Sequence, residues 1–172
     1  MMNYEQQISK MSKMVMAILK ERNAKMVTAE SCTGGMLASS MVANAGSSEV
    51  FEGGIVAYQN HVKHMLLNVS NEILENLKLG PVSPQCALRM CSGALSQFPE
   101  ATYAVSTTGF AGPGGFDVGK VYIGISKRGN TPEQNVCHEF HFKGDRDTVR
   151  QKATLAALIQ LYYFIAFDEA YL

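Results

Sequence analysis

The chain has 172 residues, of which 47% are hydrophobic and 17% charged, and its 15 lysines and arginines balance its 15 acidic residues. This length suits a single domain over 1–172, and a neutral chain lacks the excess positive charge that favours nucleic acid as a partner. No apolar run approaches the roughly 20 residues of a membrane span and the first residues do not resemble a secretion signal, so the sequence predicts a soluble, cytoplasmic protein that does not enter membranes.

The first half of the chain is predicted to alternate helices and strands. Apolar residues at helical spacing indicate helices, and short β-leaning runs bounded by glycine indicate strands. Gly53 and Gly54 inside one such run indicate a bulge or close backbone packing, and Asn60 can cap the helix that follows. In chain order, the sequence predicts a helix over 4–22, a strand over 25–29, a helix over 36–46, a strand over 51–58, a helix over 60–67 and a short helix over 71–77.

The second half is predicted to place three strands between two helices. Ser83 followed by Pro84 is a typical helix start, and the turn before Asp145 precedes the last helix. In chain order, the sequence predicts a helix over 84–97, strands over 101–107, 120–126 and 135–142, and a helix over 145–169. A chain that begins as strand, helix, strand and ends in a meander predicts an α/β fold, a three-layer α/β/α sandwich with a mixed β-sheet.

Residues 29–35 read AESCTGG and place three candidate nucleophiles, Ser31, Cys32 and Thr33, between a carboxylate and two glycines. The segment leads from a predicted strand into the start of a predicted helix. Free amides and the positive end of the helix dipole make this a favourable place for an anion or a developing oxyanion. A hydroxyl in the same turn can equally cap the helix, so the residues alone leave capping, binding and catalysis open.

A serine nucleophile needs a base, and neither segment that flanks AESCTGG contains a histidine. Lys63 and Tyr58 are the nearest titratable groups in the adjoining unit. A lysine base needs a pKa about 3 units below its usual value of roughly 10.4, which corresponds to about 4 kcal/mol of burial and neighbouring charge. A helix dipole contributes only about 1 kcal/mol, so it cannot lower the pKa that far alone.

A glycine-rich loop separates the predicted strands that end near Gly109 and begin near Lys120. Its spacing matches the first part of a phosphate-binding P-loop, but Val121 stands where that loop needs Ser or Thr, and a strand follows in place of a helix. ATP binding is therefore not expected. What remains is a flexible loop that can bring amides to a ligand, or a hairpin that is only structural.

Arg146 and Arg150 lie four residues apart on the last predicted helix and so project from one face. They can bind a phosphate together. The alternative, equally compatible with the sequence, is that Asp145 or Asp147 caps the helix while the arginines form surface ion pairs worth under about 1 kcal/mol.

No metal site is expected from the histidines and cysteines. His138 and His141 leave opposite faces of a predicted strand, and no carboxylate or cysteine lies at ligand spacing beside His61 and His64. The four cysteines form no CxxC pair, so we expect reduced thiols.

Five segments together resemble the CinA C-terminal domain family. They are TAESCTGG at 28–35, GSSEVFEGGIVAYQNHVKHMLLNV at 46–69, VS at 82–83, STTGFAGPGG with VGKVYIGI at 106–125, and FKGDRDTVRQKAT at 142–154. Members of this family include stand-alone bacterial nicotinamide-mononucleotide amidases. These hydrolyse the carboxamide of nicotinamide mononucleotide to nicotinic acid mononucleotide and ammonia, which returns the pyridine ring to NAD synthesis. The resemblance implies neither a metal nor an organic cofactor.

Carried over by motif, the resemblance implies that Ser31 is the nucleophile, Lys63 its general base, and Tyr58 a hydrogen-bonding partner that orients the base or relays the proton. The amides of residues 33–35 are implied to cradle an oxyanion or a phosphate. The substrate-binding positions that the resemblance implies are Glu30, Thr33, Gly34, Gly35, Asn60, Gly109, Ala111, Gly112, Arg146 and Arg150.

Two further features bear on function and assembly. The loop after AGPGG is shorter than in typical members, and some stand-alone paralogues are thought to lack the amidase activity, so a catalytically silent nucleotide-binding or regulatory domain is the alternative. The 10 methionines and the apolar run at 158–167 predict a homodimer, although an ordinary core helix also explains that run.

Overall fold

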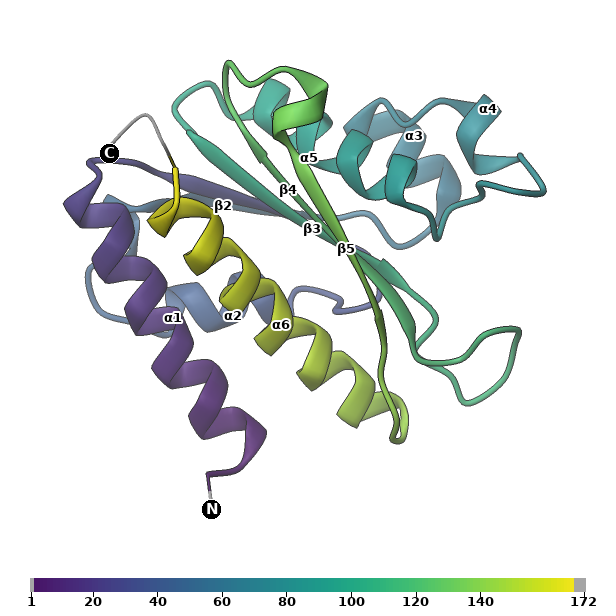
Figure 1. Cartoon of the computed structure of the whole chain (residues 1–172), viewed down its shortest axis with the longest axis horizontal. Coiled ribbons are helices and arrows are strands. Elements are labelled where there is room, and N and C mark those ends of the chain that lie inside the picture. Colours follow the sequence, from purple (N-terminus) through teal and green to yellow (C-terminus); the bar gives the residue numbers. More distant parts are fainter. Residues whose placement is uncertain (1, 169–172) are drawn as a thin grey trace.

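The computed structural model describes residues 2–168 as one mixed five-stranded sheet with helices on both faces (Figure 1). The α-helices are α1 (Tyr4–Glu21), α2 (Met36–Val42), α3 (Asn60–Leu67), α4 (Asn71–Leu74), α5 (Pro84–Gln97) and α6 (Arg146–Ala166), and two short 3-10 helices are η1 (Ser47–Glu49) and η2 (Pro132–Gln134). The strands are β1 (Met26–Glu30), β2 (Phe51–Val56), β3 (Tyr103–Gly109), β4 (Lys120–Lys127) and β5 (Val136–His141). The predicted three-layer α/β/α sandwich with a mixed sheet is confirmed.

The strand order, β2-β1-β3-β4-β5, explains where a functional site can form. β1 pairs in parallel with both β2 and β3, whereas β4 runs antiparallel to β3 and β5 antiparallel to β4. The carboxyl ends of β1, β2, β3 and β5 therefore meet at one edge of the sheet. The segments that follow these strands, including the first turn of α6, are brought to that edge from distant parts of the sequence.

Two hydrophobic layers hold the helices on the sheet. α1, α2 and α6 cover one face, and α3, α4 and α5 cover the other (Figure 1). The first layer packs around Leu19, Leu158 and Leu161, and the second around Leu67 and Met90, all fully buried. Burial of this apolar surface is the main source of stability. Within residues 2–168, none of the helices is long and apolar enough to cross a membrane.

Asparagine side chains end two helices earlier than the sequence predicts. α2 was expected to continue to residue 46 but ends at Val42, where the Asn44 amide donates to the carbonyls of Ser40 and Met41 that would otherwise accept helical bonds. α4 ends at Leu74 and not at residue 77, because the Asn76 side chain accepts from the amides of the next turn. Local competition of this kind is a known property of asparagine.

Two cap predictions have different outcomes. The cap assigned to Asn60 is wrong, since α3 begins at Asn60 itself and the capping position is Gln59, whose side chain makes no cap bond. Asp145 does cap α6, because its carboxylate accepts from the amide of Thr148 at 2.8 Å. α6 ends at Ala166, earlier than the predicted end at residue 169, which itself lies outside the described residues.

Gly53 and Gly54 in β2 were predicted to mark either a bulge or close backbone packing, and the structure shows both features. The pairing of β1 with β2 shifts register between Met26 and Val27, which is the predicted irregularity. A Cβ on Gly54 would lie 2.3 Å from Thr28 Oγ1, and one on Gly53 would lie 2.7 Å from the Phe98 ring. β2 can therefore approach its neighbours only because both positions lack a side chain.

Candidate active site

The hydroxyl of Ser31 and the amine of Lys63 meet at the carboxyl edge of the sheet. Ser31 directly follows β1, and Lys63 lies in the first turn of α3 after the neighbouring strand β2. Lys63 Nζ is 3.1 Å from Ser31 Oγ and 3.0 Å from the main-chain oxygen of Tyr58. Both side chains are buried, with 6% of Ser31 and 2% of Lys63 exposed. The parallel pairing of β1 and β2 thus joins residues that are 32 positions apart.

Burial lowers the pKa of Lys63 from its ordinary value, with the neighbouring thiols of Cys86 and Cys32 acting in the opposite direction. A lowered pKa leaves more of the amine neutral at a given pH. A neutral amine keeps one lone pair that can take the Ser31 proton while it still donates to the Tyr58 carbonyl. The direction is the one that a lysine base requires.

Cys32 is poorly suited to be the nucleophile of the loop. Its side chain is 4% exposed. Burial raises the pKa of its thiol to about 11, and the nearby Glu30 carboxylate adds to the rise. Because the thiolate is the reactive form, this thiol is almost entirely unreactive near neutral pH. Ser31, with a neighbouring amine, is the better candidate.

Residues 31–35, called the serine loop below, turn from β1 into α2 around the Glu30 carboxylate. That carboxylate is fully buried and accepts from the Leu37 amide, from the Ala38 amide and from the Thr33 hydroxyl, at 2.9, 2.9 and 2.7 Å. Glu30 therefore occupies the amides at the start of α2, and neither Ser31 nor Thr33 caps the helix. A direct contact between Glu30 and a substrate does not fit this burial.

In the rest of the serine loop, the Thr33 hydroxyl is bonded within the protein and two glycines have left-handed backbone conformations. Thr33 Oγ1 lies 2.7 Å from both Glu30 Oε1 and Thr107 Oγ1. Gly34 and Gly35 adopt φ angles of 59° and 94°, in the left-handed region where a side chain is strained. Within residues 2–168, the main-chain amides of Cys32, Thr33 and Gly35 donate no hydrogen bond to another residue. Thr33 is fully buried and 4% of Cys32 is exposed, whereas Gly35 is partly exposed.

Thr107 is a residue that the sequence analysis missed. Its carbonyl accepts from the Ser31 amide at 2.9 Å, and its hydroxyl bonds to Thr33. The sequence held one usable signal, since a polar residue at the carboxyl end of a strand parallel to β1 must lie beside the serine loop.

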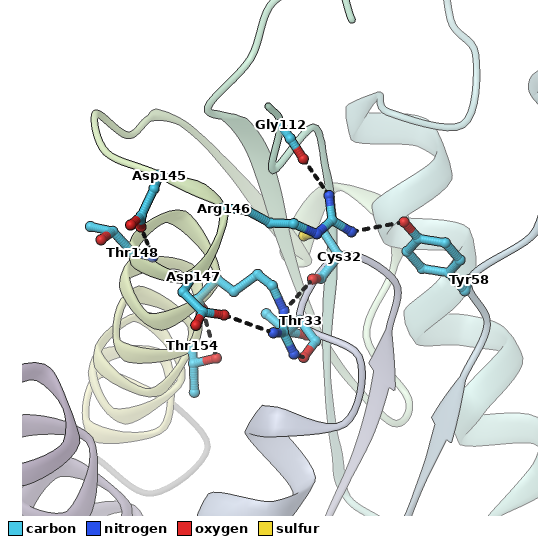
Figure 2. Close-up of polar contacts among 10 residues, drawn as sticks. Cys32, Thr33, Tyr58, Gly112, Asp145, Arg146, Asp147, Thr148 and Thr154 are labelled. Atoms are coloured by element: carbon cyan, nitrogen blue, oxygen red, sulfur yellow. Dashed lines mark hydrogen bonds and ion pairs between the residues drawn. The ribbon is translucent and has the colours of Figure 1, made fainter. Parts of the chain in front are cut away.

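Tyr58 and Arg146 are linked to each other and not to the serine. Arg146 Nη2 donates to the Tyr58 hydroxyl at 3.0 Å, and Arg146 Nη1 donates to the carbonyl of Gly112 (Figure 2). Half of the Tyr58 side chain is exposed. Among the described residues, its hydroxyl makes no bond to Ser31 or Lys63. Tyr58 contacts Lys63 through its main-chain oxygen.

For the amidase reaction that the family resemblance implies, we expect Tyr58→Phe to reduce turnover by less than about tenfold, because the carbonyl that contacts Lys63 is retained. Steady-state kinetics on the purified variant measures this. A loss of three orders of magnitude would instead assign the hydroxyl to proton transfer.

Arg150 does not join Arg146 in a shared fork. Its guanidinium donates to the carbonyls of Cys32 and Thr33 and pairs with Asp147, at 3.3, 3.0 and 3.2 Å. These three acceptors surround one guanidinium in Figure 2. The predicted surface ion pair is present, but the carbonyl contacts tie α6 to the serine loop.

The remaining predicted positions line the same edge without joining these side-chain contacts. Asn60 is exposed at the start of α3, and Ala111 is 5% exposed beside the Gly112 carbonyl that receives Arg146. A Cβ on Gly109 would lie 2.6 Å from the Lys120 carbonyl, so this glycine permits close pairing of β3 with β4. No group of three histidine, cysteine or acidic side chains in the described part of the chain could hold a metal ion.

These observations define the class of protein. It is a mixed α/β sandwich with a buried serine and lysine pair at the carboxyl edge of its sheet. The chain belongs to the CinA family, because the model of the CinA C-terminal domain matches residues 8–165. It is 39% identical over 156 residues to a CinA-like protein of Thermotoga neapolitana, and the match covers 88% of this chain and 36% of the relative. The chain thus spans about a third of the length of such curated relatives.

Solved structures with similar length show the same fold. The competence damage-inducible protein A of Klebsiella pneumoniae is 31% identical with a TM-score of 0.87, and the match covers 94% of this chain and 99% of that one. A competence/damage inducible protein of Agrobacterium tumefaciens is 33% identical with a TM-score of 0.87, covering 95% and 99%.

Proposed function

We propose that this protein hydrolyses the carboxamide of nicotinamide mononucleotide to nicotinic acid mononucleotide and ammonia. The observation that carries the proposal is the 3.1 Å contact between Lys63 Nζ and Ser31 Oγ, made in a buried setting that lowers the pKa of the amine. A carboxamide carbon needs a strong nucleophile, and a serine becomes one only when a base takes its proton. Membership of the CinA family supports the choice of substrate.

The proposed reaction has two halves. In the first, Ser31 Oγ attacks the carboxamide carbon and its proton moves to Lys63, after which the carbon–nitrogen bond breaks and Lys63 returns the proton to the departing ammonia. In the second, Lys63 takes a proton from water, whose oxygen attacks the ester carbon, and the proton is returned to Ser31 as the acid leaves. No metal or organic cofactor enters either half.

The oxyanion of each half is proposed to bind the loop amides of Cys32 and Gly35, since Thr33 is fully buried. The first amides of α2 cannot serve, because Glu30 already occupies those of Leu37 and Ala38. Amides fixed in advance at the position where charge develops can contribute several powers of ten to the rate.

The nucleotide is proposed to lie across the same edge of the sheet. Arg146 is exposed and belongs to the first turn of α6, where a phosphate also meets the positive end of a helix. The remaining proposed contacts come from the exposed residues Gly34 and Asn60, from Gly109 at the end of β3, and from Ala111 and Gly112 in the loop that follows it.

The assembly and location of the protein belong to the same proposal. We infer that the protein is a single-domain, cytoplasmic homodimer. The molecule that it binds is inferred to be a small nucleotide substrate. Exposed apolar side chains at Met14, Tyr163 and Phe167, on α1 and at the end of α6, support pairing of that helical face with a second copy.

The direct test is ammonia release from nicotinamide mononucleotide. We expect the purified protein to release ammonia, and Ser31→Ala to lower turnover by at least about 10³-fold while it still binds the nucleotide, since only the nucleophile is removed. Ser39→Ala, an exposed serine on α2, is the matched control and should keep full turnover. Binding of the nucleotide by wild type without any ammonia release would reject the amidase and favour the catalytically silent nucleotide-binding alternative.

A further inference from the structure

The serine loop is held from one side by a buried negative charge. Glu30 Oε1 accepts from the Thr33 hydroxyl and the Leu37 amide, and Oε2 accepts from the Ala38 amide. A fully buried carboxylate is stable only when its oxygens are bonded, and the start of a helix supplies suitable donors. This carboxylate therefore ties the loop to the first turn of α2, and it leaves no exposed oxygen for a ligand.

The same loop is held from another element by a positive charge. Arg150 Nε donates to the Cys32 carbonyl at 3.3 Å, and Arg150 Nη2 donates to the Thr33 carbonyl at 3.0 Å. Because Nη1 pairs with Asp147 at 3.2 Å, all three guanidinium nitrogens are engaged within the protein. α6 thereby fixes two consecutive carbonyls of a loop that lies more than 100 residues away in the chain.

Fixing a carbonyl also fixes the amide that follows it. A peptide unit is planar and trans, so the N–H of Thr33 points away from the Cys32 carbonyl in the same plane. A positive donor on that carbonyl also polarises the unit, which strengthens the N–H as a hydrogen-bond donor. Arg150 is thus placed to fix the peptide unit that joins Cys32 to Thr33, directly after Ser31.

Arg146 is more exposed than Arg150 and has different partners. It is exposed, it contacts the Tyr58 hydroxyl and the Gly112 carbonyl, and it makes no contact with the serine loop among the described residues (Figure 2). One helical turn therefore separates an exposed arginine from one that holds the backbone of the serine loop.

We propose that Glu30 and Arg150 are positioning residues, which clamp the serine loop between α2 and α6 and bind no part of the substrate. The catalytic consequence rests on the proposed amidase function: the clamp aligns Ser31 with Lys63 and aims the loop amides at the oxyanion. Arg146 is left as the arginine that meets the nucleotide.

Separate measurement of kcat and KM tests the Arg150 half of the clamp. We expect Arg150→Met to lower kcat about 100-fold and to change KM by less than about threefold, because misplacement of a nucleophile by about 1 Å costs that much. The amine of Arg150→Lys can donate to one of the two loop carbonyls but cannot hold both as the planar guanidinium does. This variant should therefore recover part of kcat. Arg146→Met should mainly raise KM. A rise in KM at unchanged kcat for Arg150→Met would overturn the proposal.

Amide hydrogen exchange tests the clamp without any substrate. We expect Arg150→Met to speed exchange of the peptide that covers residues 31–35, whereas Arg146→Met leaves it unchanged. Glu30→Gln keeps the shape of the side chain but turns one acceptor into a donor, so exchange at Leu37 and Ala38 should also rise. Unchanged exchange in both Arg150→Met and Glu30→Gln would reject the clamp. Absence of ammonia release from wild type would instead reject the proposed amidase function. The clamp would then be tested by the hydrogen-exchange measurements alone.

Discussion

Replacement of Lys63 by methionine is expected to abolish ammonia release and to stabilise the protein near neutral pH. The amine is the only base in contact with Ser31 in the described structure, so turnover should fall by at least about 10³-fold. The same amine is buried without a carboxylate among the groups that shift its pKa. Exchange of a buried charge for an apolar side chain of similar length is expected to stabilise the fold by about 1 kcal/mol or more.

The stability gain depends on pH, with a sign that follows from the lowered pKa of Lys63. In the unfolded chain this amine returns to its ordinary pKa of 10.5, so the unfolded state binds more protons over the window between the lowered pKa and 10.5. The free energy of unfolding of wild type therefore rises with pH across that window. Below the window, the folded protein carries the full cost of the buried ammonium.

Thermal or urea unfolding from neutral pH to about pH 10 measures this difference directly. The advantage of Lys63→Met over wild type should be largest at the low end and shrink as the pH rises. Lys10→Met removes an exposed lysine on α1 and should show neither effect. Wild-type kcat/KM should rise with pH through the lowered pKa, since only the neutral amine can accept the serine proton. A variant less stable than wild type at every pH would contradict a destabilising ammonium.

The features that the sequence predicted well are those set by residue pattern and strand pairing. Apolar periodicity located the main helices and strands, and the polar segments after β1 and β2 must meet because parallel neighbours end at one edge. The motif resemblance singled out Ser31 and Lys63, and the structure places them in contact. A strand after the glycine-rich loop was also predicted, and β4 begins there at Lys120.

The features that the sequence could not predict depend on where individual side chains find partners. The early end of α2 follows from bonds that Asn44 makes only in that turn. Glu30 looked like a ligand-facing carboxylate, but the left-handed glycines at Gly34 and Gly35 curl the loop so that α2 amides reach it. The contacts of Arg150 with loop carbonyls require the docked position of α6, which no local pattern encodes.

Gly93 in α5 is a position where a single added methyl group is expected to destabilise the protein strongly. A Cβ there would lie 2.0 Å from the carbonyl oxygen of Leu67 and 2.6 Å from its carbonyl carbon, at the end of α3. Ordinary contacts are about 3.5–4 Å, so the two helices would have to separate by more than 1 Å. In an isolated helix, Gly→Ala is favourable by about 1 kcal/mol. Here the backbone overlap reverses that sign.

We expect Gly93→Ala to destabilise the protein by about 2–3 kcal/mol, which corresponds to a fall in Tm of roughly 4–12 °C for a chain of this size. Differential scanning calorimetry measures the shift. Gly114→Ala is the matched control, because its Cβ would meet no atom within 4 Å and its stability should be unchanged. Displacement of α3 should also carry Lys63 away from Ser31, so kcat should fall together with Tm. A Gly93→Ala protein with the stability and turnover of wild type would contradict the close approach of α3 to α5 and its role in holding the base.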